Sequence, residues 1–126
     1  MSELAPTEHR LCIAAFRITS IYEEARPADL NGRASSEVFA GLVPGARVVK
    51  AFNHLPPHLL SGDPHPEGGR RVLFHAGDDA RAKAAVSTLI DTLGFFAIDL
   101  GLLGAGGRLF QFPGGPLLTH NLIKLD

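Results

Sequence analysis

The sequence predicts an α/β fold, and features of its middle part carry that prediction. Residues 45–53 and 71–76 are short apolar segments bounded by glycine or proline, as buried strands are. Residues 79–93 carry apolar side chains at three- and four-residue steps, the period of an amphipathic helix. Residues 95–99 form a third apolar segment. A strand, a helix and a strand in this order normally make a parallel pair joined by a crossover.

The segment 45–53 is the one that we expect to position a site. Its apolar part, residues 48–52, contains one charged residue, Lys50, and Asn53 and His54 follow at its end. In open α/β sheets, ligands bind outside the carboxyl ends of the strands. Asn53 and His54 are therefore the first candidates for contact with a ligand.

The amino-terminal residues carry a mixed signal. Residues 10–22 are rich in β-branched and aromatic side chains, which fits a strand. They also place four apolar side chains on one helical stripe, namely Leu11, Ala14, Ile18 and Ile21. We favour the helix. Because residues 26–33 read as a turn-rich linker, we divide the chain into an amino-terminal segment, 1–28, and a domain, 29–126.

Two short helices are expected beside the central strand. Ser35 fits an N-cap and Glu37 lies in the first turn, where a negative charge complements the helix dipole, so we place a helix at 36–42. The two prolines after His54 can start a helical turn at 57–61, and an exposed loop rich in glycine and proline follows.

The helix at 79–93 has a start and a stop signal. Asp78 can cap its first turn, Asp79 adds a first-turn charge, and Gly94 can end it. We interpret the two aspartates in this way and not as a catalytic pair.

Residues 101–108 are rich in glycine and follow a predicted strand, as a phosphate-binding loop would. Their glycine spacing matches neither GxGxxG nor GxxxxGK[ST], so a flexible turn or close helix packing is favoured. Further along, residues 117–125 have apolar positions that predict a terminal amphipathic helix.

Composition limits the classes of function. A chain of 126 residues with 12 basic and 13 acidic side chains and a net charge of -1 fits one domain without a nucleic-acid or membrane-surface footprint. Cys12 is the only cysteine, so neither an internal disulfide nor a cysteine zinc site is expected. No apolar stretch reaches the ~18 residues of a membrane span. We expect a soluble, cytoplasmic protein.

Several polar residues have two readings each. Asn53 could orient a flat cofactor ring through its amide, or form a turn at a strand end. Lys50 could be a site cation, or could extend to solvent at a sheet edge. His75 could be an acid-base group or a hydrogen-bonded core histidine. Asp99 could be a site carboxylate or a turn-forming residue, and the sequence leaves both open.

A metal site is not expected. His54 and His58 are four residues apart, as a helical metal pair would be, but two prolines lie between them and no third ligand is evident.

Several motifs in order resemble one family. They are Pro44-Gly-Ala-Arg-Val-Val-Lys-Ala-Phe-Asn53, Ala76-Gly-Asp-Asp79, Leu93-Gly94-Phe95 and Asp99-Leu-Gly101. Together they resemble the second half of the coenzyme F-420-dependent NADP oxidoreductase family, whose relatives include the cytosolic reductase domain of six-transmembrane metalloreductases. The resemblance covers about residues 29–126.

The resemblance implies a partial Rossmann-like sheet, the second half of a doubly wound fold, with flanking helices. It implies that NADP(H) binds and passes hydride to a deazaflavin or flavin ring. The segment Ala51-Phe52-Asn53 would lie near the nicotinamide, and with His54 and Asp99 it forms the predicted cofactor-binding set. No metal and no catalytic side chain are assigned.

One part of the family pattern is missing. The first strand and the glycine-rich phosphate loop would precede residue 29, and 28 residues are too few to hold them. A half-sheet exposes an apolar edge, so we expect a homodimer or a complex with a complementary nucleotide-binding half. The alternative is a non-catalytic α/β binding or dimerisation module derived from the family.

Overall fold

The computed structural model describes residues 10–14, 32–111 and 114–125. In chain order, the elements are β1 Arg10–Ala14, α1 Ser35–Leu42, β2 Ala46–Ala51, α2 Pro57–Leu60, a 3-10 turn at Pro66–Gly68, β3 Arg70–Gly77, α3 Ala80–Thr92, β4 Phe96–Asp99, α4 Leu103–Leu109 and β5 Ile123–Lys124.

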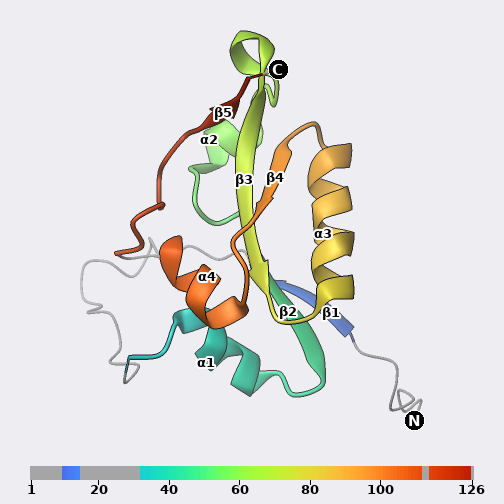
Figure 1. The fold of residues 1–126 in the computed structure, drawn as a ribbon, viewed down its shortest axis with the longest axis vertical. Helices are drawn as coiled ribbons and strands as arrows, with labels where there is room; N and C mark the ends of the chain where they lie inside the picture. The colour runs from blue at the N-terminus through green and yellow to red at the C-terminus, as the bar shows by residue number, and fades with distance from the viewer. Residues whose placement is uncertain (1–9, 15–31, 112–113, 126) are drawn as a thin grey trace.

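The strands form one mixed sheet in the order β1-β2-β3-β4, with β5 added to the start of β3 (Figure 1). β1 runs parallel to β2, β2 runs antiparallel to β3, and β3 runs parallel to β4. The predicted α/β class with flanking helices is confirmed, and so is the parallel pair that the helix α3 connects.

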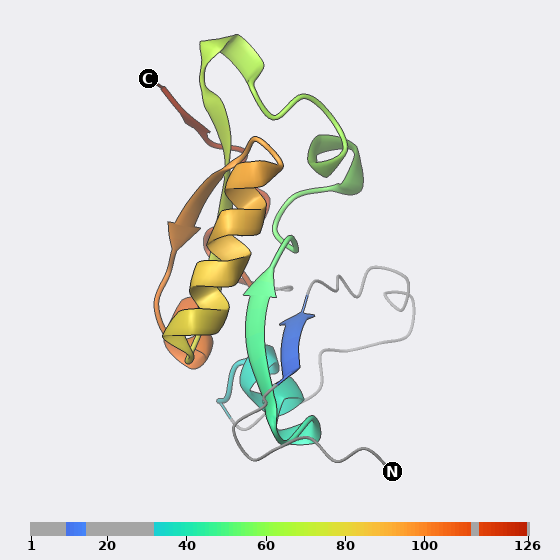
Figure 2. The ribbon, with the colours of Figure 1, turned by 90° about the vertical axis from the view of Figure 1, so that its right-hand side faces the viewer.

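Helices cover both faces of the sheet (Figures 1 and 2). Alternate residues of a strand point to opposite faces, so Val49 and Leu73 pack against α3 while Val48 and Phe74 pack on the side of α1 and α4. The core is therefore divided into two layers by the sheet.

The prediction of a helix near the amino terminus is wrong for residues 10–14. They form strand β1, the alternative reading, because their backbone pairs with β2 from Arg10 opposite Ala46 to Ala14 opposite Lys50. The tertiary partner overrides the local helical stripe. The rest of the predicted helix and the boundary near residue 28 lie outside the described residues.

Helix α1 begins one residue earlier than predicted. Its N-cap is Ala34 and not Ser35, and the first-turn Glu37 accepts a hydrogen bond from the Ala34 N–H at 3.0 Å through Oε1. An acidic residue three positions after the N-cap thus accepts a hydrogen bond from the N-cap backbone N–H, which has no partner inside the helix.

The two aspartates before α3 have other roles than those predicted. Asp79 is the N-cap, accepting from the Ala82 N–H at 2.8 Å, and this hydrogen bond lowers the pKa of Asp79 below its ordinary value. Asp78 accepts from the N–H of Leu103, the first residue of α4, at 2.9 Å. Each aspartate therefore stabilises the start of a different helix.

Three other predictions that concern the helices are confirmed. The turn after the prolines is helix α2, and Gly94 follows α3 with a φ of 95°, a value that favours glycine. The glycine-rich segment forms α4, which confirms close helix packing.

The predicted helix at 117–125 is wrong. Residues 116–119 form a turn, and β5 pairs with Arg70 and Arg71 at the start of β3. The Arg71 guanidinium also donates to the side-chain oxygen of Asn121. Pairing with β3 thus satisfies backbone N–H and C=O groups of this segment, which would pair with one another in a terminal helix.

Candidate functional site

The carboxyl end of β2 is the centre of the predicted site, and an unusual backbone conformation lies there. Ala51 ends the strand and is fully buried, and Phe52 follows with a φ of 61°. Few residues other than glycine adopt such a φ. Phe52 packs with the α3 layer, whereas the next residue, Asn53, contacts the α4 side. The turn thus redirects the chain from one face of the sheet to the other.

Asn53 is buried, with 1% of its surface exposed. Its Nδ2 donates to the carbonyl oxygen of Phe110, directly after α4, at 2.9 Å. Its Oδ1 is buried and accepts no hydrogen bond from the described part of the chain. A buried carbonyl oxygen without a donor costs about 1–3 kcal/mol. This oxygen is therefore the unsatisfied group of the predicted site.

His54 is a core residue. Its ring is fully buried and lies 4.6 Å from the ring of Phe74 and 6.4 Å from the ring of Phe110, measured between centroids. Its carbonyl oxygen accepts from the Thr119 N–H at 2.8 Å, which holds the carboxyl-terminal turn against the sheet. The surroundings suit packing better than ligand contact.

Lys50 is buried with 6% exposure, although it carries a charge. Its Nζ donates to the carbonyl oxygen of Gly107 at 3.2 Å and lies 5.2 Å from the centroid of the Phe110 ring. Burial lowers the pKa of Lys50 to about 8. The interpretation as an edge lysine is wrong, because β2 lies between β1 and β3.

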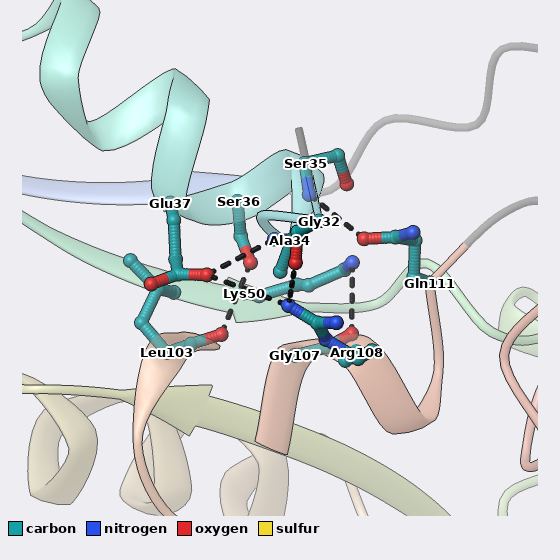
Figure 3. A network of polar contacts seen from close by, with 10 residues as sticks. All are labelled: Gly32, Ala34, Ser35, Ser36, Glu37, Lys50, Leu103, Gly107, Arg108 and Gln111. Carbon is teal, nitrogen blue, oxygen red and sulfur yellow. Dashed lines mark hydrogen bonds and ion pairs between the residues drawn. The ribbon is translucent and has the colours of Figure 1, made fainter. Parts of the chain in front are cut away.

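A polar network joins α1 to α4 beside Lys50 (Figure 3). Ser36 Oγ donates to the Leu103 carbonyl at 3.1 Å, and the Ser35 N–H donates to Gln111 Oε1 at 2.7 Å. A Cβ added to Gly107 would lie 2.5 Å from Ser36 Oγ, so only glycine allows this approach. Sequence reasoning did not single out Ser36 or Gln111 for these contacts, and the adjacent glycines were the available signal.

Asp99 ends strand β4, which is two strands away from β2, the strand that Asn53 follows. In the strand register Ala51 is opposite His75, and His75 is opposite Asp99, so two strand spacings separate β2 from β4 at this level. The Asp99 side chain contacts Lys83 and Gly101, whereas that of Asn53 contacts the carbonyl of Phe110. Ala51, Phe52, Asn53 and His54 are consecutive at the end of β2, but the first two side chains pack in the α3 layer and the last two contact Phe74 and Phe110 on the α4 side, and Asp99 lies apart from all four.

The contacts of Asp99 confirm the turn-forming interpretation, and its role as a site carboxylate stays a prediction. Its Oδ1 accepts from the Gly101 N–H at 2.7 Å, which forms a turn, and its Oδ2 lies 3.1 Å from Lys83 Nζ. Burial alone would raise the pKa of Asp99, but the Gly101 hydrogen bond and the Lys83 charge lower it. The carboxylate is thus charged and paired.

His75 lies near the carboxyl end of β3 and is buried, with 3% exposure. Burial lowers its pKa, and the Lys83 charge acts in the same direction, against the Asp99 charge. The predicted core position is confirmed, but its Nδ1 accepts or donates no hydrogen bond within the described residues.

No group of three or more histidine, cysteine, aspartate or glutamate side chains that could hold a metal ion occurs within residues 10–14, 32–111 and 114–125. Over the same described ranges, none of the helices is long and apolar enough to cross a membrane.

Comparison with known proteins supports the relationship that the motifs suggested. No family model matches the chain. The chain is 35% identical over 81 residues to the metalloreductase STEAP3 of Rattus norvegicus, a match that covers 64% of this chain and 16% of that protein.

Similar solved structures include the following two. The hypothetical protein SMa0349 from Sinorhizobium meliloti is 41% identical, with a TM-score of 0.78, over 94% of this chain and 58% of that one. A proposed F420-dependent NADP reductase from Arthrobacter sp. FB24 is 34% identical, with a TM-score of 0.51, over 65% and 39%.

The chain therefore spans less than two thirds of each of these relatives. Since the first structural match covers 94% of the chain, it extends beyond residues 29–126 into the amino-terminal segment. The similarities support a relationship to NADP-dependent reductases and agree with the α/β fold described above.

Proposed function

We propose that this chain is part of an NAD(P)-dependent oxidoreductase, and that the carboxyl end of β2 forms the wall of the dinucleotide site that faces the nicotinamide. The observation that carries the proposal is the buried Asn53 Oδ1, which lacks a donor among the described residues. A nicotinamide carboxamide presents an N–H donor of the kind that this oxygen needs. The similarity to a proposed NADP reductase and to a metalloreductase points to the same class.

In this proposal each residue of the wall has a distinct role. Asn53 orients the carboxamide, with its own Nδ2 held by the Phe110 carbonyl so that the amide has one orientation. Ala51 and Phe52 pack in the α3 layer behind the wall, and the turn at Phe52 places Asn53 on the α4 side. His54 supports the wall from the core. Asp99 lies outside this wall, across the sheet.

The bound NADPH would supply a hydride, and we propose a deazaflavin or flavin ring as the class of acceptor. Because Asn53 is 1% exposed, a ligand reaches it only when the chain that covers it moves aside. The wall positions one end of the ligand only. We therefore propose that a second copy of the chain or a complementary nucleotide-binding half holds the pyrophosphate.

One observation favours a second candidate function. Asn53 and His54 are both buried, and the His54 ring is packed between aromatic rings, as expected for structural residues. In that case the chain is a non-catalytic α/β binding or dimerisation module. The two candidates differ in whether NADPH binds at Asn53.

The discriminating experiment is an NADPH titration of the full chain, followed by nucleotide fluorescence and thermal shift. Asn53→Ala is compared with Ser36→Ala, because each removes one buried hydrogen bond to the α4 region and only the first alters the proposed wall. We expect saturable binding that Asn53→Ala weakens at least about tenfold, or about 1.4 kcal/mol, and that Ser36→Ala retains. No binding of millimolar NADPH to the wild-type chain, with the complementary half added if the chain sediments as a monomer, would instead support the non-catalytic module.

The proposed assembly has its own test, sedimentation of the full chain at micromolar concentration. A dimer supports pairing between copies, and a monomer excludes the homodimer and leaves the complementary half as the partner to be added to the NADPH titration.

A further inference from the structure

The chain between α4 and β5 crosses the carboxyl end of β2. Residues 115–119 form a strap there, at the side of the molecule (Figure 1). The Leu117 N–H donates to the carbonyl of Leu109, the last residue of α4, at 2.8 Å. Two residues further on, the Thr119 N–H donates to the His54 carbonyl, also at 2.8 Å. The strap therefore links the end of α4 to the chain that follows β2.

The side chain of Asn53 joins the same two parts of the chain. Asn53 precedes His54, and its Nδ2 donates to the carbonyl of Phe110, the residue after Leu109. The side chain of Leu117 packs on the core cluster that contains Phe110. The strap thus passes over the junction in which Asn53 is buried, with an exposed fraction of 1%.

Backbone strain is concentrated at this junction. In the part of the chain that the structure describes, three residues other than glycine have a positive φ, namely Phe52 at 61°, Thr119 at 65° and Glu67 at 53°. Phe52 precedes Asn53, and Thr119 bonds to the next residue, whereas Glu67 lies in the exposed turn before β3. A side chain branched at Cβ, such as threonine, rarely adopts this conformation. Such strain persists only where surrounding contacts impose it, and it gathers at ligand sites.

Two features of the closed strap favour its opening. One is the strain at Thr119, which is released when the strap leaves His54. The other is Asn53 Oδ1, which is buried without a donor among the described residues and gains a partner once water or a ligand reaches it. Few contacts oppose these two terms, since none of residues 115–119 is buried. The closed and open states should therefore be close in free energy.

We propose that the strap is a strained cover of the proposed dinucleotide wall, and that it opens locally to admit the ligand. While the strap is closed, Asn53 is out of reach, so the open fraction limits the apparent affinity for NADPH. The identity of the ligand rests on the proposed function, whereas the opening is a property of the chain alone.

The test is native-state hydrogen exchange of the full chain, in which the Leu117 amide reports on the strap and the amides of β3 report on global unfolding. Thr119→Gly is compared with Glu67→Gly. Each replaces an exposed residue of positive φ by glycine, which adopts this φ without strain and adds the same freedom to an open chain. Only the first substitution lies in the strap.

In the wild type, the Leu117 amide should exchange at least about tenfold faster than the amides of β3 after correction for intrinsic rates, and low urea concentrations should not accelerate it. Thr119→Gly should slow this exchange about fivefold or more, because the closed strap loses its strain. Glu67→Gly should leave the exchange of Leu117 as it is in the wild type.

Two exchange results would overturn the proposal. One is a Leu117 amide that exchanges only together with the amides of β3, because the strap would then open only when the whole chain unfolds. The other is equal exchange of Leu117 in Thr119→Gly and Glu67→Gly, which would mean that the closed strap holds no strain.

An NADPH titration of the same two variants tests the link to the proposed site. Thr119→Gly should weaken NADPH binding by the factor by which it slows the exchange of Leu117, and Glu67→Gly should retain the wild-type affinity. Slower exchange with unchanged affinity would overturn the role of the strap as a cover of this site. A wild-type chain that binds no NADPH would instead refute the proposed function, and the exchange result would still decide whether the strap opens.

Discussion

The two faces of the sheet are packed in different ways. On the α3 face, aliphatic side chains of the strands meet Ala82, Val86 and Ile90 of the helix, and an open pocket lies at the β4 edge. On the α4 face, a glycine-containing helix approaches so closely that the polar groups of Lys50 and Asn53 bond directly to backbone carbonyls.

This difference relates packing to chemistry. An apolar interface tolerates exchanges of aliphatic side chains that conserve volume, which usually cost less than about 1.5 kcal/mol. A close backbone approach with buried polar groups has little freedom, since each donor has one acceptor within reach. We therefore expect substitutions on the α4 face to have larger effects on stability than comparable ones on the exposed sides of the helices.

The largest effect is expected at Gly106. An added Cβ would lie 2.5 Å from the Leu100 carbonyl oxygen and 2.8 Å from its carbon, and these backbone atoms have little room to shift. Although alanine is the better helix former by about 1 kcal/mol, Gly106→Ala should lower the free energy of unfolding by more than about 3 kcal/mol. Urea denaturation followed by circular dichroism measures this change.

Gly41→Ala is the control for that substitution. Gly41 is also helical, but an added Cβ there meets nothing within 4 Å. This variant should gain about 0.5–1 kcal/mol of stability from helix propensity. A Gly106→Ala variant as stable as Gly41→Ala would refute the close approach of α4.

The next effect is a pH dependence produced by Lys50. Its pKa is lowered from 10.5 to about 8, so between these values the unfolded chain binds a proton that the folded chain does not. Stability should therefore rise with pH in this window, by at most roughly 3 kcal/mol, because each pKa unit corresponds to about 1.4 kcal/mol.

The measurement compares urea denaturation of the wild type and Lys50→Met from pH 7 to pH 10.5. Methionine retains most of the buried chain and removes the charge, so contributions from all other titrating groups are common to both proteins. The wild type should gain stability relative to Lys50→Met as the pH rises. Parallel curves would mean that Lys50 is not desolvated in the folded protein.

The smallest effects concern the two aspartates that start the helices on opposite faces. Asp79→Ala should lower stability by about 1 kcal/mol through the loss of the α3 cap. Asp78→Ala should instead release the Leu103 N–H at the start of α4. Native-state hydrogen exchange distinguishes them, since faster exchange should appear at Ala82 in the first variant and at Leu103 in the second.

The elements with a clear local pattern could be predicted from the sequence. β2, β3, α3 and β4 each combine an apolar period with turn residues at both ends, so the neighbouring residues determine the element. β1 and β5 differ, because their backbone hydrogen bonds depend on strands that lie far away in the sequence. Local periodicity favoured helices there, and long-range pairing produced strands.

The candidate site shows the same limit. The place of Asn53 at a strand end followed from the local pattern, whereas the direction of its side chain depends on Phe110, 57 residues away. The partner of Ser36 is 67 residues away and that of the Ser35 N–H is 76 residues away. A single sequence contains no local signal for such pairs, so these contacts could not be predicted.

The most direct test of the account concerns the side-chain amide of Asn53. Its Nδ2 resonance in 1H–15N spectra reports the hydrogen bond to Phe110, and its Oδ1 is the oxygen proposed to accept from the nicotinamide. During a titration of the folded chain with NADPH, together with its partner half if sedimentation shows a monomer, this resonance should shift saturably. An Asn53 resonance that stays unchanged up to millimolar NADPH would contradict the proposed dinucleotide wall.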